Sequence, residues 1–161
     1  MTQLTFGYSD SEDRLWLRFS NDPAQLWLSR RLARSLIIHL IEQMTLSCPG
    51  DPACGASADP KHRLGLEHEM SREVVQETGR GARVPSPDMA PASASFLLTS
   101  FKLNVTSQQV IIECIAPGYG RGLALMRNEA HTVLAALVSR CLSAEWDFKD
   151  LPAWLTSQQA L

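Results

Sequence analysis

The sequence has few of the features that assign a chain to a functional class at once. No apolar run approaches the roughly 18 residues needed to cross a membrane, and the first residues contain neither a basic nor an apolar segment typical of secretory signals. The net charge is only −2 and the isoelectric point about 6.1. A nucleic-acid-binding domain is expected to be strongly basic, so the composition argues against a nucleic-acid partner. We therefore expect a cytoplasmic protein with no membrane span.

Familiar catalytic motifs are missing as well. The chain contains no G-x-S-x-G nucleophile elbow and no H-E-x-x-H zinc helix. The glycine-rich stretch 117–122 precedes a short apolar run of strand character, whereas a phosphate-binding loop leads directly into a helix. We interpret this stretch as a flexible hairpin loop that carries Tyr119 and Arg121 at its tip.

Cysteine usage indicates a reducing compartment. Cys114 and Cys141 fall in apolar segments, which is typical of small buried hydrophobic residues. Without an export signal we expect free thiols. Arginine far outnumbers lysine, a composition found in bacteria with GC-rich genomes. The expected setting is a bacterial cytoplasm.

Residues 45–95 differ from the rest of the chain and predict a connector. Proline and glycine are concentrated there, which favours loops because both disturb regular backbone structure. Within this connector the segment 61–78 predicts a short helix, since Leu66, Met70 and Val74 recur at helical spacing.

Residues 1–44 predict three strands followed by a helix. Apolar and polar residues alternate over 4–8 and 15–19, and a short apolar run covers 25–28. Ser29 then stands at the position of a helix N-cap. The following helix has one apolar face, made of Leu32, Leu36, Ile37, Leu40, Ile41 and Met44.

Residues 96–145 repeat this order of elements. Strands are predicted over 96–105, 110–115 and 123–125, and a helix from about 127 to 144. At an offset of 97 positions, Leu26, Leu28 and Arg30 coincide with identical residues in the second half. Internal duplication and the general likeness of such units explain this equally well.

The predicted fold is α+β and a single domain. Two tandem β-β-β-α units, 1–44 and 96–145, are too small to form separate cores, so they should pack together. We expect one antiparallel sheet of about six strands, two helices on one face, and Leu40 and Leu137 in a shared interior. The connector 45–95 and an aromatic C-terminal tail, 146–161, complete the chain.

The connector also offers a candidate zinc site. Two thiols and two imidazoles could hold a tetrahedral Zn²⁺, although their spacing is wider than in compact zinc knuckles. The alternative is that they are exposed thiols and surface histidines, with no cofactor at all. The four residues are Cys48, Cys54, His62 and His68.

Two further groups are candidate binding residues. Arg30, Arg31 and Arg34 begin the first helix, where they oppose the helix dipole and favour an anionic partner; the alternative is a solvated face paired with nearby carboxylates. In the tail, three large aromatic residues either fold back over the sheet or dock on another subunit. These are Trp146, Phe148 and Trp154.

Three hypotheses about function follow. The first is a non-enzymatic binding or adaptor protein that self-associates, with a homodimer favoured because two such units leave exposed strand edges. The second is a small-molecule or anion sensor that uses Arg30, Arg34, Tyr119 and Arg121. The third is a metal-binding protein or enzyme built on the connector cysteines and histidines.

Overall fold

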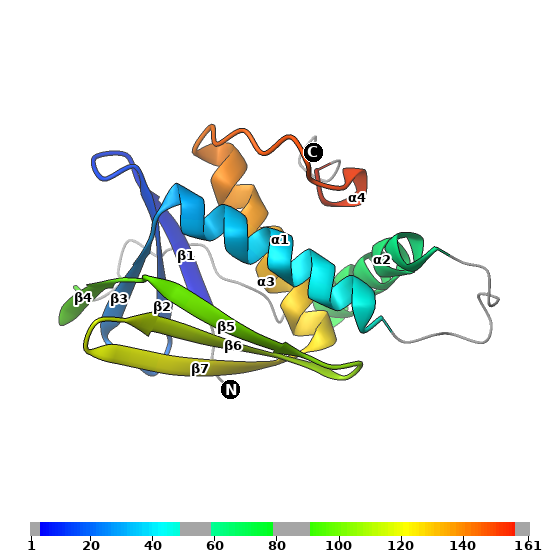
Figure 1. Ribbon diagram of the computed structural model, residues 1–161, viewed down its shortest axis with the longest axis horizontal. Coiled ribbons are helices and arrows are strands. Elements are labelled where there is room, and N and C mark those ends of the chain that lie inside the picture. Colours follow the sequence, from blue (N-terminus) through cyan, green and yellow to red (C-terminus); the bar gives the residue numbers. More distant parts are fainter. Residues whose placement is uncertain (1–3, 49–58, 79–90, 157–161) are drawn as a thin grey trace.

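A computed structural model of the chain describes residues 4–48, 59–78 and 91–156 (Figure 1). The first half forms the expected three strands, which pair in an antiparallel meander, and the following helix. Side chains alternate between buried and partly exposed positions along β2 and β3, as the alternating sequence predicts. The elements are β1 (Leu4–Ser9), β2 (Arg14–Phe19), β3 (Ala24–Leu28) and α1 (Arg30–Leu46).

α1 begins where the sequence predicts. The hydroxyl of Ser29 accepts a hydrogen bond from the backbone N–H of Leu32, which satisfies one of the free donors of the first turn. The predicted apolar face points inward, with Ile37, Leu40 and Met44 fully enclosed. Leu32 and Ile41, at its margins, are only half-buried.

The connector helix exists but turns a different face inward. α2 (Pro60–Thr78) leaves Leu66 37% and Met70 67% exposed, so these two residues of the predicted stripe do not form its docking face. Among residues 60–73 of this helix, the buried ones are instead Leu64, Gly65, His68 and Ser71. The prediction failed because this helix docks largely through polar groups, which hydrophobic periodicity does not register.

The second half has one more strand than predicted. The expected strand 96–105 is two strands, β4 (Ala94–Leu97) and β5 (Ser100–Val105), because the backbone changes partners between them. The N–H of Leu98 donates to the carbonyl of Trp27 in β3. The N–H of Thr99 donates to the carbonyl of Ile115, which belongs to the strand over Gln109–Ala116. The remaining elements are β6 (Gln109–Ala116), β7 (Tyr119–Met126), α3 (Arg127–Ser143) and α4 (Ala153–Thr156).

The loop predicted at 117–122 is a tight hairpin. β6 ends at Ala116 and β7 already begins at Tyr119, so Gly120 and Gly122 belong to the strand. Gly118, with φ of +74°, supplies the left-handed conformation that the turn needs.

The strands form two sheets, which corrects the expectation of one antiparallel sheet of about six strands. One sheet has the order β1-β2-β3-β4 and the other β5-β6-β7. β3 and β4 pair in parallel, so the first sheet is mixed. This arrangement is possible because the chain between β3 and β4 is long enough to form a crossover that includes α1 and α2.

The two halves share one interior. α1 contacts β5 of the second half, α3 contacts β1 of the first, and the two helices contact each other. Leu40 and Leu137 lie in the same buried cluster, as the sequence predicts. No helix in the described part of the chain is long and apolar enough to cross a membrane.

The aromatic tail folds back on its own chain: Trp146 packs on β1 and the β1–β2 turn, and the later residues lie against the helices (Figure 1). Trp146 is fully buried, and its ring meets Tyr8 edge-on with the ring centroids 6.0 Å apart. Trp154 packs against α2 at Gly65, where a Cβ atom would lie 3.1 Å from the indole. The missing side chain at Gly65 therefore lets the tail approach the helix closely.

Candidate functional site

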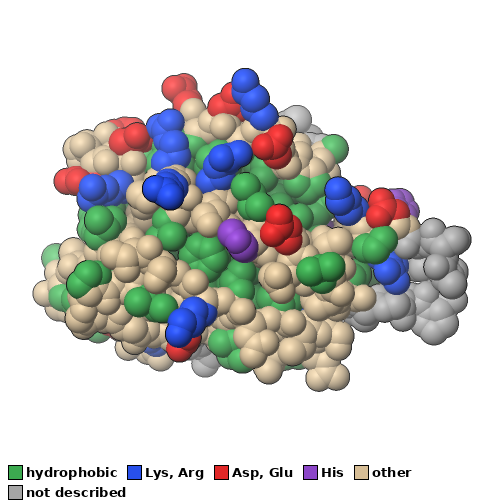
Figure 2. Space-filling view, viewed as in Figure 1, with side chains coloured by type: hydrophobic (Ala, Val, Ile, Leu, Met, Phe, Trp, Pro, Cys, Tyr) green, Lys and Arg blue, Asp and Glu red, His purple; other side chains and the backbone are tan. Residues whose placement is uncertain are grey.

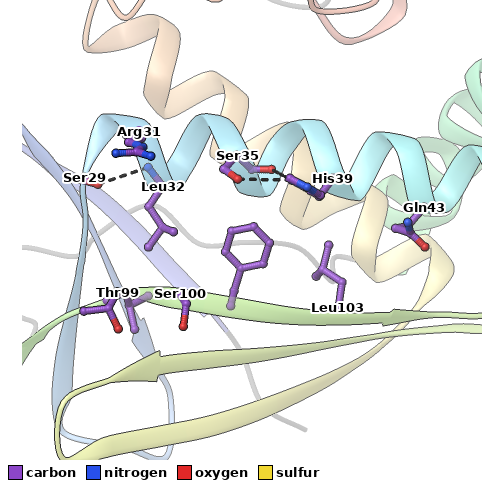
Figure 3. Close-up of a pocket in the computed structure, with 11 residues that line it drawn as sticks. Ser29, Arg31, Leu32, Ser35, His39, Gln43, Thr99, Ser100 and Leu103 are labelled. Atoms are coloured by element: carbon purple, nitrogen blue, oxygen red, sulfur yellow. Dashed lines mark hydrogen bonds between the residues drawn. The ribbon is translucent and has the colours of Figure 1, made fainter.

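A groove between α1 and β5 is the candidate binding site (Figure 3). Its volume is about 760 Å³, which lies within the range of ligand-binding clefts. α1 forms one wall, and β5 with the two residues before it forms the other. The lining residues are Ser29, Arg31, Leu32, Ser35, His39, Gln43, Leu98, Thr99, Ser100, Phe101 and Leu103.

β5 is an edge strand, and its open edge faces this groove. It pairs with β6 and with no other described strand. In Figures 1 and 3, β6 and β7 lie on the opposite side of β5 from α1. Edge strands carry backbone N–H and C=O groups without a strand partner, which makes them templates for pairing with another chain. The bend at Leu98–Thr99 creates this edge, because β3 pairs only with the part of the strand before the bend.

The groove combines apolar and polar groups. Phe101 and Leu103 are half-buried on β5, and the Phe101 ring meets His39 of α1 with centroids 6.0 Å apart. Nδ1 of His39 lies 2.7 Å from the carbonyl oxygen of Ser35. A carbonyl oxygen only accepts hydrogen bonds, so Nδ1 carries a proton. In the neutral ring Nε2 then has no proton and can accept a hydrogen bond. Apolar contact and hydrogen bonding are thus available side by side.

The arginines predicted as an anion site are largely paired. Basic and acidic side chains alternate around the start of α1 (Figure 2). Arg30 lies 3.0 Å from Asp13, and Arg34 lies 3.4 Å from Asp150. Arg31 has no ion pair among the described residues and stands at the rim of the groove. The cluster is therefore close to neutral, apart from Arg31.

Trp146, predicted as a partner anchor, is a core residue. Its Nε1 donates to Asp13 at 3.0 Å, and the Tyr8 hydroxyl donates to the same carboxylate at 2.8 Å. These two hydrogen bonds, together with Arg30, lower the pKa of Asp13. Phe148 and Trp154 are half-buried against the core. The tail aromatics are thus used within the chain itself.

Tyr119 and Arg121 also have internal partners. Both reach Asp22 in the β2–β3 turn, at 2.7 Å each, and Arg121 also donates to Asn21. Burial and the hydrogen bond to Asp22 raise the pKa of Tyr119 to about 12. The guanidinium of Arg121 lies 4.3 Å from the centroid of the Phe19 ring. These residues connect the two sheets. Arg121 pairs with Asp22 after the end of β2, whereas Arg30 pairs with Asp13 before its start, so the predicted sensor residues do not form one site.

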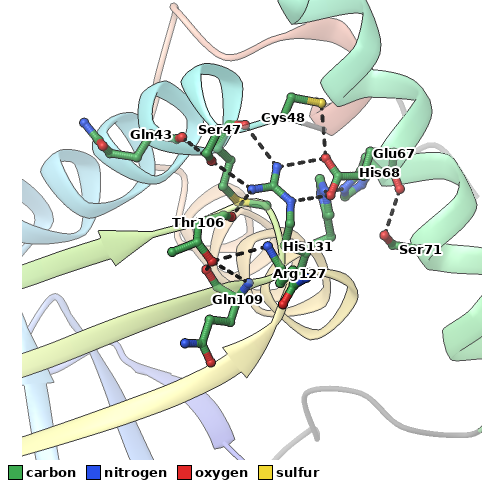
Figure 4. A network of polar contacts seen from close by, with 12 residues as sticks. Gln43, Ser47, Cys48, Glu67, His68, Ser71, Thr106, Gln109, Arg127 and His131 are labelled. Atoms are coloured by element: carbon green, nitrogen blue, oxygen red, sulfur yellow. Dashed lines mark hydrogen bonds and ion pairs between the residues drawn. The ribbon is translucent and has the colours of Figure 1, made fainter. Parts of the chain in front are cut away.

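A second polar cluster lies elsewhere, around the buried Arg127 at the start of α3 (Figure 4). Its Nε and Nη2 atoms make a bidentate pair with Glu67 of α2, at 2.6 and 2.9 Å. Its other contacts, between 2.9 and 3.0 Å, are to the Ser47 hydroxyl and the carbonyls of Thr106 and Met44. All five guanidinium N–H donors therefore have acceptors. One side chain thereby joins α1, α2, α3 and the β5–β6 turn.

Glu67 is held ionised by this environment. Burial alone would raise the pKa of the carboxyl, but hydrogen bonds from Arg127 and His131 outweigh it and lower the pKa to about 2. Nε2 of His131 lies 3.5 Å from Glu67, and its Nδ1 lies 3.1 Å from Nδ1 of His68. The carboxylate favours a proton on Nε2, so we assign Nδ1 of His131 as acceptor and Nδ1 of His68 as donor.

The predicted zinc residues do not come together in the described part of the chain. His62 is exposed on α2, whereas His68 is fully buried against His131 and Trp154. The Cys48 thiol donates to Glu67 at 3.5 Å, and Cys54 lies outside the described residues. Residues 4–48, 59–78 and 91–156 contain no group of three His, Cys, Asp or Glu side chains arranged to hold a metal ion.

Sequence reasoning missed both the groove and the polar cluster. The groove depends on where β3 ends relative to β5, and no local pattern reports this. Glu67 and Arg127 are far apart in the sequence, and each is an ordinary residue of a helix. One signal was available: Arg127 begins a helix, where a cation is unfavourable unless other groups compensate for it.

We compared the chain with protein-family models, with curated proteins and with solved structures, and none of the three comparisons finds a match.

Proposed function

We propose that this protein is a non-enzymatic binding or adaptor protein that accepts an extended peptide segment of a partner protein in the groove between α1 and β5. The observation that carries this proposal is the open edge of β5, which borders a groove of about 760 Å³. A peptide added there pairs with the free edge of β5 through main-chain hydrogen bonds and lies beside α1. Strand addition of this kind provides affinity through the backbone and selectivity through alternate side chains.

The groove also indicates which peptides fit. Successive side chains of a strand point to opposite faces, so every second residue of the peptide faces the sheet side on which Phe101 and Leu103 lie. Those two side chains and Leu32 favour apolar partners there. The proposed ligand is therefore an extended segment with apolar residues at alternate positions.

The two alternative functions have less support from the geometry. The anion sensor requires free cations, but Arg30, Arg34 and Arg121 each contact a carboxylate. The metal-dependent alternative needs His62 and His68 to converge, but one is exposed and the other is enclosed in the core.

The proposed location of the protein is the cytoplasm. Cys114 and Cys141 are buried free thiols, and burial raises their pKa values to about 11 and about 12. Both remain protonated at neutral pH and act as small hydrophobic residues, which agrees with cysteine usage in a reducing compartment.

Selection from a displayed library of random linear peptides tests the proposal. We expect enrichment of segments with alternating apolar residues, and their binding should shift the backbone amide resonances of β5 in NMR spectra. In Gln43→Trp a large side chain occupies the groove, which should weaken binding by about tenfold or more. Glu69→Trp adds the same side chain at an exposed position of α2 that does not line the groove, and should leave binding unchanged.

Two results would overturn the proposal. One is a library from which no peptide is enriched over an unrelated control protein. The other is a set of peptides that bind Gln43→Trp as tightly as the unsubstituted protein.

A further inference from the structure

α1 carries two opposite charges that have no ion pair among the described residues. Arg31 lies in its first turn and Glu42 near its C-terminal end, and both side chains are exposed. The neighbouring cations are already engaged, Arg30 by Asp13 and Arg34 by Asp150. Arg31 and Glu42 are thus the charges on the outer side of α1 that remain available to a partner.

These two charges lie on one face of the helix. They are eleven residues apart, close to three turns at 3.6 residues per turn. Ser35 and Ile38 lie between them, so the spacing along this face is four, three and four residues. This is the spacing of the seam along which two helices pack in a coiled coil.

The same face is the crest of a ridge. Arg31, Ser35 and His39 line the groove beside β5 and also a second hollow, of about 800 Å³, between α1 and the tail segment 147–150. α1 therefore stands between two depressions.

We propose that a second copy of this chain docks on this face, with the two α1 helices antiparallel about a two-fold axis. Arg31 of each copy then faces Glu42 of the other, and Ser35 faces Ile38. A parallel arrangement would place like charges opposite each other, so charge complementarity selects the antiparallel one. The small side chain of Ser35 leaves room for Ile38 of the second copy.

The remaining charges are compatible with this arrangement. Arg34 would face His39 of the second copy, but Arg34 keeps Asp150 as its counter-ion. A seam of one helix pair is smaller than a standard interface, so we expect a weak dimer with a dissociation constant in the micromolar range. Arg31 and Ser35 also line the groove beside β5, whereas Glu42 does not, so the effect of Glu42→Arg on dimerisation separates this inference from the proposed peptide binding.

Charge reversal with analytical ultracentrifugation tests the arrangement. In the dimer, residue 31 of each copy faces residue 42 of the other. Glu42→Arg therefore places two arginines opposite each other at both contacts, and Arg31→Glu places two glutamates there. Each single variant should weaken dimerisation by about tenfold or more. The double variant Arg31→Glu/Glu42→Arg restores both pairs with exchanged partners and should dimerise like the unsubstituted protein. Glu69→Arg, at an exposed position of α2, is the matched control and should have no effect.

Mixing the two single variants is the most specific test of the arrangement. Arg31→Glu chains carry two glutamates on this face and Glu42→Arg chains carry two arginines, so an equimolar mixture should form heterodimers although each variant alone is monomeric. Circular dichroism checks that both variants are folded. Monomeric unsubstituted protein at several hundred micromolar would overturn the proposal. So would single variants that dimerise normally, or monomeric variants that neither the double substitution nor mixing rescues.

Discussion

The two long helices that follow a strand begin alike and end in different surroundings. α1 and α3 both have 17 residues, and both have arginine as the first residue after an extended N-cap. Arg30 leaves 55% of its side chain exposed beside Asp13, whereas Arg127 leaves only 6% exposed. The same residue at the same position of a helix is thus a surface residue in one half and a central buried group in the other.

The difference lies in what covers each helix start. Arg127 faces the C-terminal end of α1, where it binds the carbonyl of Met44, and α2 supplies Glu67. In the described part of the chain, Arg30 at the start of α1 contacts Asp13 of the β1–β2 turn and the Trp146 ring, and it has no hydrogen bond to a second helix. Burial of a cation thus depends on whether acceptors from several elements converge on it.

The largest expected effect separates the two arginines. Arg127→Met leaves Glu67 without its bidentate partner and several acceptors without a donor, so we expect a loss of about 3–5 kcal/mol in the free energy of unfolding. Urea denaturation measures it. The double variant Arg127→Met/Glu67→Leu removes both charges and should recover part of the loss. A loss below about 1 kcal/mol in Arg127→Met would contradict the role given to the cluster.

Truncating a core leucine should destabilise the protein by a similar amount in either half. Leu40 and Leu137 are almost completely buried in the same cluster. Replacing either by alanine removes buried methyl groups and leaves a cavity, and each should cost about 2–5 kcal/mol. Urea denaturation of both variants measures this. A value below about 1 kcal/mol at either position would show that the two helices do not share one core.

Lowering the pH should destabilise the fold through Glu67 of α2. The pKa of Glu67 falls from 4.5 to about 2 in the folded protein, so its ionisation stabilises the fold above pH 4.5. This contribution is lost as the pH falls from about 4.5 towards 2, where the folded carboxyl also takes up a proton. The expected loss is about 1–2 kcal/mol, because the side chain is partly solvated. Urea denaturation across this pH range should show a flatter dependence in Glu67→Gln, whereas an unchanged slope would contradict the prediction.

The smallest effect is expected at the exposed arginine. Arg30→Met breaks one solvated ion pair with Asp13 and a cation–π contact of 5.2 Å with Trp146. Exposed pairs of this kind contribute about 0–1 kcal/mol. The thermal unfolding midpoint of Arg30→Met should therefore be close to that of the unsubstituted protein. A loss as large as that of Arg127→Met would remove the contrast between the two helix starts.

Much of the local structure could be predicted from the sequence. Alternating apolar residues located β1 and β2, Ser29 located the start of α1, and the apolar face of α1 is the buried one. These features depend on neighbours within one strand or one turn of helix, where spacing along the chain reports spacing in space. The pattern failed at α2, whose docking face contains Glu67 and His68 instead of the expected leucine and methionine.

The candidate site was beyond the reach of the sequence for a related reason. Arg31 was predicted to bind a partner, but Phe101 and Leu103, on the other wall of the groove, were assigned to an ordinary strand. A break at Leu98–Thr99 divides that strand between two sheets and opens its edge. Because alternation continues through the break, the residues on either side give no sign of it.

By itself the sequence determined the order of the strands and helices apart from the division of 96–105 and the short α4, the apolar faces of α1 and α3, and a shared interior, because each half has too little apolar surface for a core of its own. Only the tertiary structure decided how the sheet divides, which edge of β5 stays open, and which arginine is buried. These outcomes depend on groups that meet from distant parts of the chain, and hydrogen-bond partners at such distances leave no periodic trace in the sequence.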